Sequence, residues 1–218
     1  MYFPVERKAN ECNKLEHTIL AGASFIELLR RQRDAVGLSI FNEEIEIHTK
    51  AKSSATHHRT LYIEMEKRLK EVDFSNKKTN AIKAIHDIAA LTHQRSLVFI
   101  FSDMMDSEKD NQEMMQALQH LRHKKHEVVL FHVHDKKMEL DFDLENRPYN
   151  FVDLETGEKM KLSPSQIKDS YKESMDEWYK DVKLKCGQIG VDFVPLNIRE
   201  PLELVLVQYL IKRQKVVR

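Results

Sequence analysis

The stretch SLVFIFSDMMD, residues 96–106, constrains the fold more than any other part of the sequence. Its five consecutive apolar residues, 97–101, are typical of a strand that is buried on both faces of a parallel sheet. The sequence then turns acidic at Asp103. Because ligands of open parallel sheets bind beyond the carboxyl ends of the strands, Asp103 is a candidate site residue.

Helical and strand-like segments alternate along the rest of the chain. Apolar residues spaced three or four apart, together with helix start and stop signals, predict helices over 14–33, 54–72, 81–91, 110–123, 163–186 and 201–211. Short apolar runs predict strands over 35–41, 45–48, 97–101, 127–133 and 191–194. This alternation predicts one α/β domain over residues 1–218, with a mainly parallel sheet and right-handed crossovers.

Residues 151–162, FVDLETGEKMKL, interrupt the alternation. Two short segments flank a polar turn in which Gly157 can supply a positive φ, so a small β-hairpin insertion is predicted. Because it follows the strand at 127–133, we expect the hairpin to overhang or flank the ligand-facing edge of the sheet. It is either part of a site there or a surface flap without a role.

The composition excludes several classes of protein. The chain has 35 basic and 35 acidic residues and a pI near 7.2, which argues against a nucleic-acid binder or a membrane-surface protein that works by bulk charge. No apolar run approaches the ~20 residues that span a bilayer, and no signal peptide is visible. Two cysteines, far apart in sequence, form no disulfide framework, so a cytoplasmic protein is expected.

Five ordered segments resemble a known family: RQRDAVGLSIF, KKTNAIKAIHDIA, RSLVFIFSDMMD, EVVLFHVHDKKMELDF and FVDLETGEKM. Together they resemble the von Willebrand factor A-like bacterial family of unknown function whose members are often encoded beside MoxR-type ATPases. The resemblance covers nearly the whole chain and implies a doubly wound, Rossmann-type sheet. It also implies a metal-ion-dependent adhesion site, built from an Asp-x-Ser-x-Ser loop, a Thr in a second loop and an Asp after a later strand.

Two parts of that site match residues of this chain. Thr79 matches the threonine and Asp103 the later aspartate, with Asp106 as an outer-shell acid. The first loop and the strand before it have no counterpart, as though the chain started at the methionine that ends this loop. Mg²⁺ requires near-octahedral oxygen ligands. Because the first loop is missing, we expect an incomplete site that binds Mg²⁺ or Mn²⁺ weakly, and we expect no firmly bound cofactor. Alternatively, Asp103 and Thr79 cap the helices that follow them.

The segment HVHD places His132 and His134 on one face of a strand, next to Asp135. Zinc hydrolases use such His-x-His pairs, but they need a third ligand at a defined spacing, and none is visible. The sequence therefore favours a strand end over zinc catalysis. It also contains no nucleophile elbow and no glycine-rich phosphate loop.

The function expected from this combination is a protein-interaction module and not an enzyme, with a MoxR-type AAA+ ATPase as the partner that the resemblance implies. Nucleic acid and membrane are not expected as partners. The alternative is a Mg²⁺-dependent phosphoryl-transfer or phosphoacceptor protein that uses Asp103, which would need further acids and a lysine nearby. A third interpretation is a truncated reading frame with no independent role.

The missing first strand leads to predictions about the sheet. Asp103 is expected to lie beside Asp135 and Glu139, since consecutive strands are usually neighbours. The strands 35–41 and 97–101 are expected to close up and pair directly in a sheet of about five strands. Alternatively, the gap is filled by a segment of a second copy, with residues 2–5 as the apolar candidate, because unpaired edges invite self-association.

Overall fold

A computed structural model of the chain describes residues 12–41, 44–70, 81–93, 95–104, 108–145, 147–152 and 159–216. The helices are α1 (Lys14–Arg31), α2 (Ala55–Lys70), α3 (Ala81–Leu91), α4 (Glu108–His123), α5 (Pro164–Gln188) and α6 (Leu202–Val216), with a short π-helix, η1 (Lys136–Leu140). The strands are β1 (Ser39–Phe41), β2 (Ile45–His48), β3 (Leu97–Ser102), β4 (Glu127–His134), β5 (Tyr149–Val152), β6 (Lys159–Leu162) and β7 (Asp192–Asn197). The predicted mixed α/β class with a parallel sheet is confirmed.

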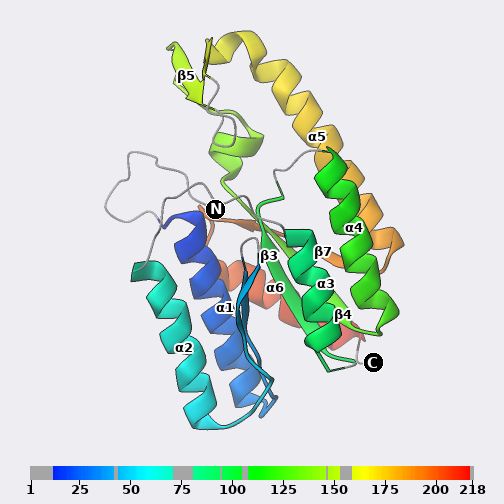
Figure 1. Cartoon of the computed structure of the whole chain (residues 1–218). Coiled ribbons are helices and arrows are strands. Elements are labelled where there is room, and N and C mark those ends of the chain that lie inside the picture. The colour runs from blue at the N-terminus through cyan, green and yellow to red at the C-terminus, as the bar shows by residue number, and fades with distance from the viewer. Residues whose placement is uncertain are drawn as a thin grey trace.

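Within the described residues, the main sheet has three parallel strands in the order β3-β4-β7 (Figure 1). The central strand, β4, is buried from Val128 to His134, as expected of a strand with neighbours on both sides and helices on both faces. Its side chains alternate between two apolar layers. Val128 and Leu130 point to one layer, and Val129, Phe131 and Val133 to the other.

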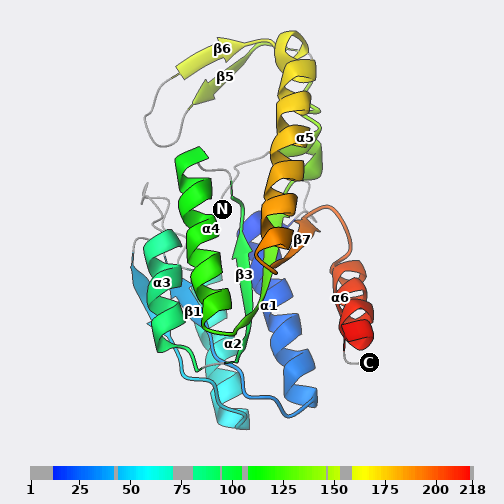
Figure 2. The same ribbon diagram turned by 90° about the vertical axis from the view of Figure 1, so that its right-hand side faces the viewer.

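Helices cover both faces of this sheet, as the two views together show (Figures 1 and 2). One face packs against α3, α4 and α5, for example through Leu118 and Val182. The other face packs against α1 and α6, where Phe25 contacts the ring of Phe99 at a centroid distance of 4.6 Å. Outside the sheet, α2 packs on α1. None of the described helices is long and apolar enough to cross a membrane.

The prediction that strands 35–41 and 97–101 pair directly is wrong. The strand in the first range is limited to β1, which pairs antiparallel with β2 in a separate two-stranded sheet. An isolated bridge between Val36 and Lys52 extends this pairing. A neighbour a few residues away satisfies the backbone groups of β1 at a small loop-closure cost, whereas pairing with β3 would close a much longer loop. The main sheet therefore has three described strands instead of about five.

Two antiparallel strands, β5 and β6, lie where the hairpin was predicted, and β5 begins at Tyr149, before the predicted start at residue 151. Tyr149 lies opposite Leu162, and Val152 lies opposite Lys159. The turn with Gly157 lies outside the described residues. The pair stands near the N-terminal end of α5, on the side of the molecule toward which β3 runs (Figure 2).

Candidate functional site at the carboxyl edge of the sheet

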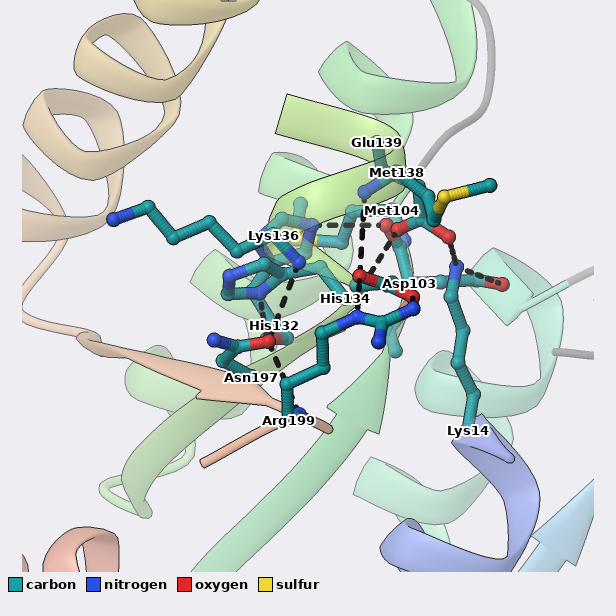
Figure 3. A network of polar contacts seen from close by, with 12 residues as sticks. Lys14, Asp103, Met104, His132, His134, Lys136, Met138, Glu139, Asn197 and Arg199 are labelled. Atoms are coloured by element: carbon teal, nitrogen blue, oxygen red, sulfur yellow. Dashed lines mark hydrogen bonds and ion pairs between the residues drawn. The ribbon is translucent and has the colours of Figure 1, made fainter. Parts of the chain in front are cut away.

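The three parallel strands end at one edge, and polar side chains gather there. The register pairs Ser102 with His132 and His134 with Asn197, so the residues that follow β3, β4 and β7 converge. Figure 3 shows this group, here called the carboxyl-edge cluster. Its members are Lys14, Asp103, His132, His134, Asp135, Glu139, Asn197 and Arg199. Lys14 contacts both Asp103 and Glu139, which confirms the prediction that Asp103 lies beside the loop after β4.

Lys14 enters the cluster from the first turn of α1. Asn13 caps this helix in a capping box: its side chain accepts a hydrogen bond from Glu16 N at 2.6 Å, and its own N–H donates to the Glu16 carboxylate at 2.8 Å. The Nζ of Lys14 lies 2.5 Å from Glu139 Oε1 and 3.9 Å from Asp103 Oδ2. The Lys14 side chain is 2% exposed, that of Glu139 4%, and that of Asp103 33%. Lys14 and Glu139 therefore form a buried ion pair, and Asp103 is its solvent-accessible neighbour.

The turn after β4 holds Glu139 in place. Asp135 caps η1, because its Oδ1 accepts a hydrogen bond from Met138 N at 3.2 Å. In return, Asp135 N donates to Glu139 Oε2 at 3.2 Å. Burial raises the pKa of the Glu139 carboxyl, an effect that the Lys14 ammonium opposes. The short η1 thus aims the Glu139 side chain back under the sheet edge, toward Lys14.

Arg199 neutralises the second acid of this turn. Its Nε and Nη2 donate to Asp135 Oδ1 and Oδ2, each at 2.7 Å, in a bidentate pair. Burial alone would raise the pKa of Asp135, but the hydrogen bonds from Arg199 hold it below its ordinary value. Asn197 links the segment after β4 to the segment after β7. Its Oδ1 accepts hydrogen bonds from Lys136 N at 3.3 Å and from Arg199 N at 3.2 Å.

The two histidines of β4 form the part of the cluster nearest α5. His132 is 1% exposed; its Nε2 donates to the backbone oxygen of Asp103 at 3.1 Å, which leaves Nδ1 as the unprotonated nitrogen. No hydrogen-bond partner of Nδ1 exists among the described residues. Burial, together with the smaller effect of the nearby His134, lowers the pKa of His132 to about 3. The His132 ring packs edge-on against Trp178 at 5.3 Å and stacks on His134 at 4.7 Å.

The structure places one of the three predicted site residues. Asp103 lies at the sheet edge as expected, whereas Thr79 and Asp106 lie outside the described residues. Whether Thr79 and Asp103 share a metal ion therefore stays a prediction, and so does the helix-cap alternative. Within the described ranges, no group of three or more His, Cys, Asp or Glu side chains can hold a metal ion.

Sequence reasoning missed the three basic or amide members, Lys14, Asn197 and Arg199. Only Lys14 had a local signal. The segment Asn13-Lys14-Leu15-Glu16 fits a capping box, which fixes the helix start and puts Lys14 on its first turn. Nothing near Arg199 in the sequence indicates a partner at Asp135.

Comparison with known proteins gives one match. A family model described as "Protein of unknown function DUF58" matches residues 5–180, which is most of the 218-residue chain. No curated protein and no solved structure matches. The chain therefore belongs to the family of proteins of unknown function DUF58.

Proposed function

We propose that this chain is a protein-interaction module with a doubly wound, von Willebrand A-like fold, and that it binds an extended, uncharged segment of a MoxR-type AAA+ ATPase along the outer side of β3. The observation that supports this proposal concerns β3, which is an outer strand of the main sheet as far as the structure describes the chain, and which has the sequence LVFIFS. It contains no charge and no proline, the devices that usually protect a sheet edge.

The outer side of β3 is identified by its hydrogen bonds. Glu127 N donates to Ser96 O at 3.0 Å, so the backbone groups of Ser96 face β4. Successive residues of a strand present their backbone groups to alternate sides, which makes Leu97, Phe99 and Phe101 face away from β4. Within the described ranges, no strand pairs with this side.

The opposite outer strand, β7, is protected. Ile198 N donates to His134 O at 3.0 Å, so Ile198 faces β4 and, by the same alternation, Pro195 faces outward. Proline lacks the N–H that an added strand would need. The two outer strands therefore differ. The proline of β7 hinders the pairing of a further strand, whereas β3 has no proline. A strand added at β3 would lie between the two apolar layers, which explains why its partner should be apolar and uncharged.

A proline in β3 tests this proposal. Phe99→Pro removes an outward N–H and copies the block of Pro195, while Phe99→Ala removes the same aromatic ring and keeps the N–H. With the MoxR-type ATPase from the same organism as the probe, we expect Phe99→Ala to bind and Phe99→Pro to bind at least about tenfold more weakly than Phe99→Ala, the effect of one or two lost hydrogen bonds. Binding is measured by biolayer interferometry, and circular dichroism verifies that both variants fold.

Two results would contradict the proposal. Equal binding by the proline and alanine variants would place the interface elsewhere, and no binding by the wild-type chain would reject this partner. A second copy of this chain is the other possible occupant of the edge, and sedimentation of the chain alone tests it. A dimer that Phe99→Pro dissociates would show that β3 pairs with a second copy instead.

One observation favours phosphoryl transfer as a second candidate function. Lys14 Nζ lies 3.9 Å from the accessible Asp103 carboxylate, which supplies the lysine that this chemistry requires. In the reaction, an Asp103 oxygen attacks the phosphorus of a phosphoryl donor, the P–O bond to the leaving group breaks, and an acyl phosphate forms.

Acetyl phosphate with Mg²⁺ tests this candidate, since acetate is then the leaving group. If the candidate is correct, intact-protein mass spectrometry shows the addition of one phosphoryl group, and Asp103→Asn abolishes it. Arg199 and Lys14 already neutralise Asp135 and Glu139, so few acids of the described cluster can hold Mg²⁺, and this candidate ranks second. Absence of the modification would reject it.

A further inference from the structure

The adhesion site that the resemblance implies requires a divalent cation at the sheet edge, and the described residues do not fit one. Mg²⁺ and Mn²⁺ prefer several oxygen ligands with the charge of one or more carboxylates. At this edge Asp135 already holds Arg199 through both carboxylate oxygens, and Glu139 holds Lys14. Asp103 is the remaining carboxylate of the cluster, and the described ranges contain no metal-binding group of three acidic, histidine or cysteine side chains.

A positive charge is nevertheless present at this edge, and a side chain of the protein supplies it. The Lys14 ammonium lies between the carboxylates of Glu139 and Asp103, at 2.5 Å and 3.9 Å. We propose that Lys14 is the resident cation of the carboxyl edge, which takes the place of a divalent metal ion and keeps one from binding. This inference does not depend on the proposed partner.

The position of Lys14 in its helix supports this role. Positive side chains in the first turn of a helix are unfavourable, because the N-terminal end of the helix already carries a partial positive charge. Lysine is also almost never fully buried unless it is paired. Lys14 departs from the first rule, as the first residue of α1, and meets the second at 2% exposure through its pairing with Glu139 and Asp103. Neither helix formation nor packing explains a lysine there, whereas two converging carboxylates do.

Removal of the Lys14 charge should create a metal site. In Lys14→Met, the carboxylates of Glu139 and Asp103 lose the ammonium that lies between them, so they attract a divalent ion. With Mn²⁺ as the probe, titrated into the whole chain and followed by electron paramagnetic resonance, we expect no saturable binding by the wild type below about millimolar concentration. We expect Lys14→Met to bind at least about tenfold more tightly than the wild type.

Two further variants define the site. Asp103→Asn in the Lys14→Met background should abolish the gained binding, since Asp103 is a proposed ligand. Lys137→Met removes an exposed lysine whose Nζ lies 3.7 Å from Asp143, and it should behave as the wild type. If Lys14→Met folds poorly, Mn²⁺ should raise its melting temperature more than that of the wild type.

The wild type alone can overturn the inference. Micromolar Mn²⁺ binding that Asp103→Asn abolishes would mean that the edge holds a metal ion beside Lys14. Failure of Lys14→Met to gain Mn²⁺ affinity or Mn²⁺-dependent thermal stability would equally overturn it, because the carboxylates would then not form a cation site.

Discussion

Replacement of Lys14 by methionine should lower the free energy of unfolding by about 3–5 kcal/mol in the absence of metal ions. The substitution keeps an unbranched side chain, shorter by the terminal ammonium group, and removes its charge. Glu139, 4% exposed, then retains a buried carboxylate without the ammonium that lies 2.5 Å away in the wild type. Breaking one half of a buried pair costs more than the pair itself contributes, because the remaining charge is no longer compensated. Urea denaturation near neutral pH measures the difference.

A second substitution separates the lost charge from lost packing. In Lys14→Met/Glu139→Gln the buried charge is gone, and the amide oxygen can still accept the hydrogen bond from Asp135 N. This variant should recover most of the lost stability. Lys137→Met, at an exposed pair, should change stability by less than about 0.5 kcal/mol. A loss below about 1 kcal/mol in Lys14→Met would mean that water reaches Glu139 and that the pair is not buried in solution.

The sequence predicts the central part of the fold because the signals there are local. In β4, period-two alternation assigns Val128 and Leu130 to one layer and Phe131 to the other without knowledge of the partners. The neighbours β3 and β4 follow from their order along the chain, through the rule that consecutive parallel strands are adjacent. Asp103 was found in the same way, from its position after a strand.

The rest depends on contacts between distant residues. β1 has only three residues, and nothing within SIF decides whether they pair with β2 or with β3. The expectation of direct pairing relied on the strand order of a family, whereas a short connection to β2 determines the observed pairing. Similarly, the sequence between Lys14 and Glu139 contains no pattern that joins the two residues. The packing of helices and strands determines which distant residues form ion pairs. The spacing of residues along the sequence does not predict this packing.

The two proposals assign different tasks to neighbouring parts of the sheet. The side of β3 provides backbone hydrogen bonds and an apolar strip, and the carboxyl edge provides a rigid, largely neutralised cluster. Of the five charged side chains in that cluster, Asp103 is the more exposed acid, with 33% of its side chain accessible, against 6% for Asp135 and 4% for Glu139. One end of a strand that binds along β3, whether parallel or antiparallel, would lie near the Asp103 carboxylate.

Acid should destabilise the protein at pH values where most carboxylates are still ionised, because of His132. Burial lowers its pKa in the folded chain to about 3, whereas a histidine in an unfolded chain titrates near 6.5. Between these values the unfolded state binds the additional proton, so the stabilisation from neutral His132 is complete above about pH 6.5 and is lost as the pH falls toward about 3. At about pH 5 the loss from this residue is about 2 kcal/mol.

The charged and titratable groups around His132 decide how the experiment is designed. His134 and Lys14 also disfavour a proton on its ring, and the pKa of His134 is lowered by burial in the same direction. Glu139 acts in the opposite sense, because its raised pKa favours the folded state as the pH falls. The overall pH dependence is therefore a sum, and His132→Phe isolates one part of it. Phenylalanine fits the aromatic surroundings of Trp178 and Phe193 and cannot bind a proton.

Urea denaturation at about pH 7.5 and about pH 5 should give a smaller difference in unfolding free energy for His132→Phe than for the wild type, by about 2 kcal/mol. The substitution also removes the hydrogen bond to Asp103 O, so both values shift downward, but their difference reports only the proton. His123→Gln, at an exposed position of α4, should leave the wild-type difference unchanged. If the difference in unfolding free energy between the two pH values is equal in His132→Phe and in the wild type, His132 can be protonated within the folded protein. This would require an acceptor near Nδ1 and looser packing between β4 and α5.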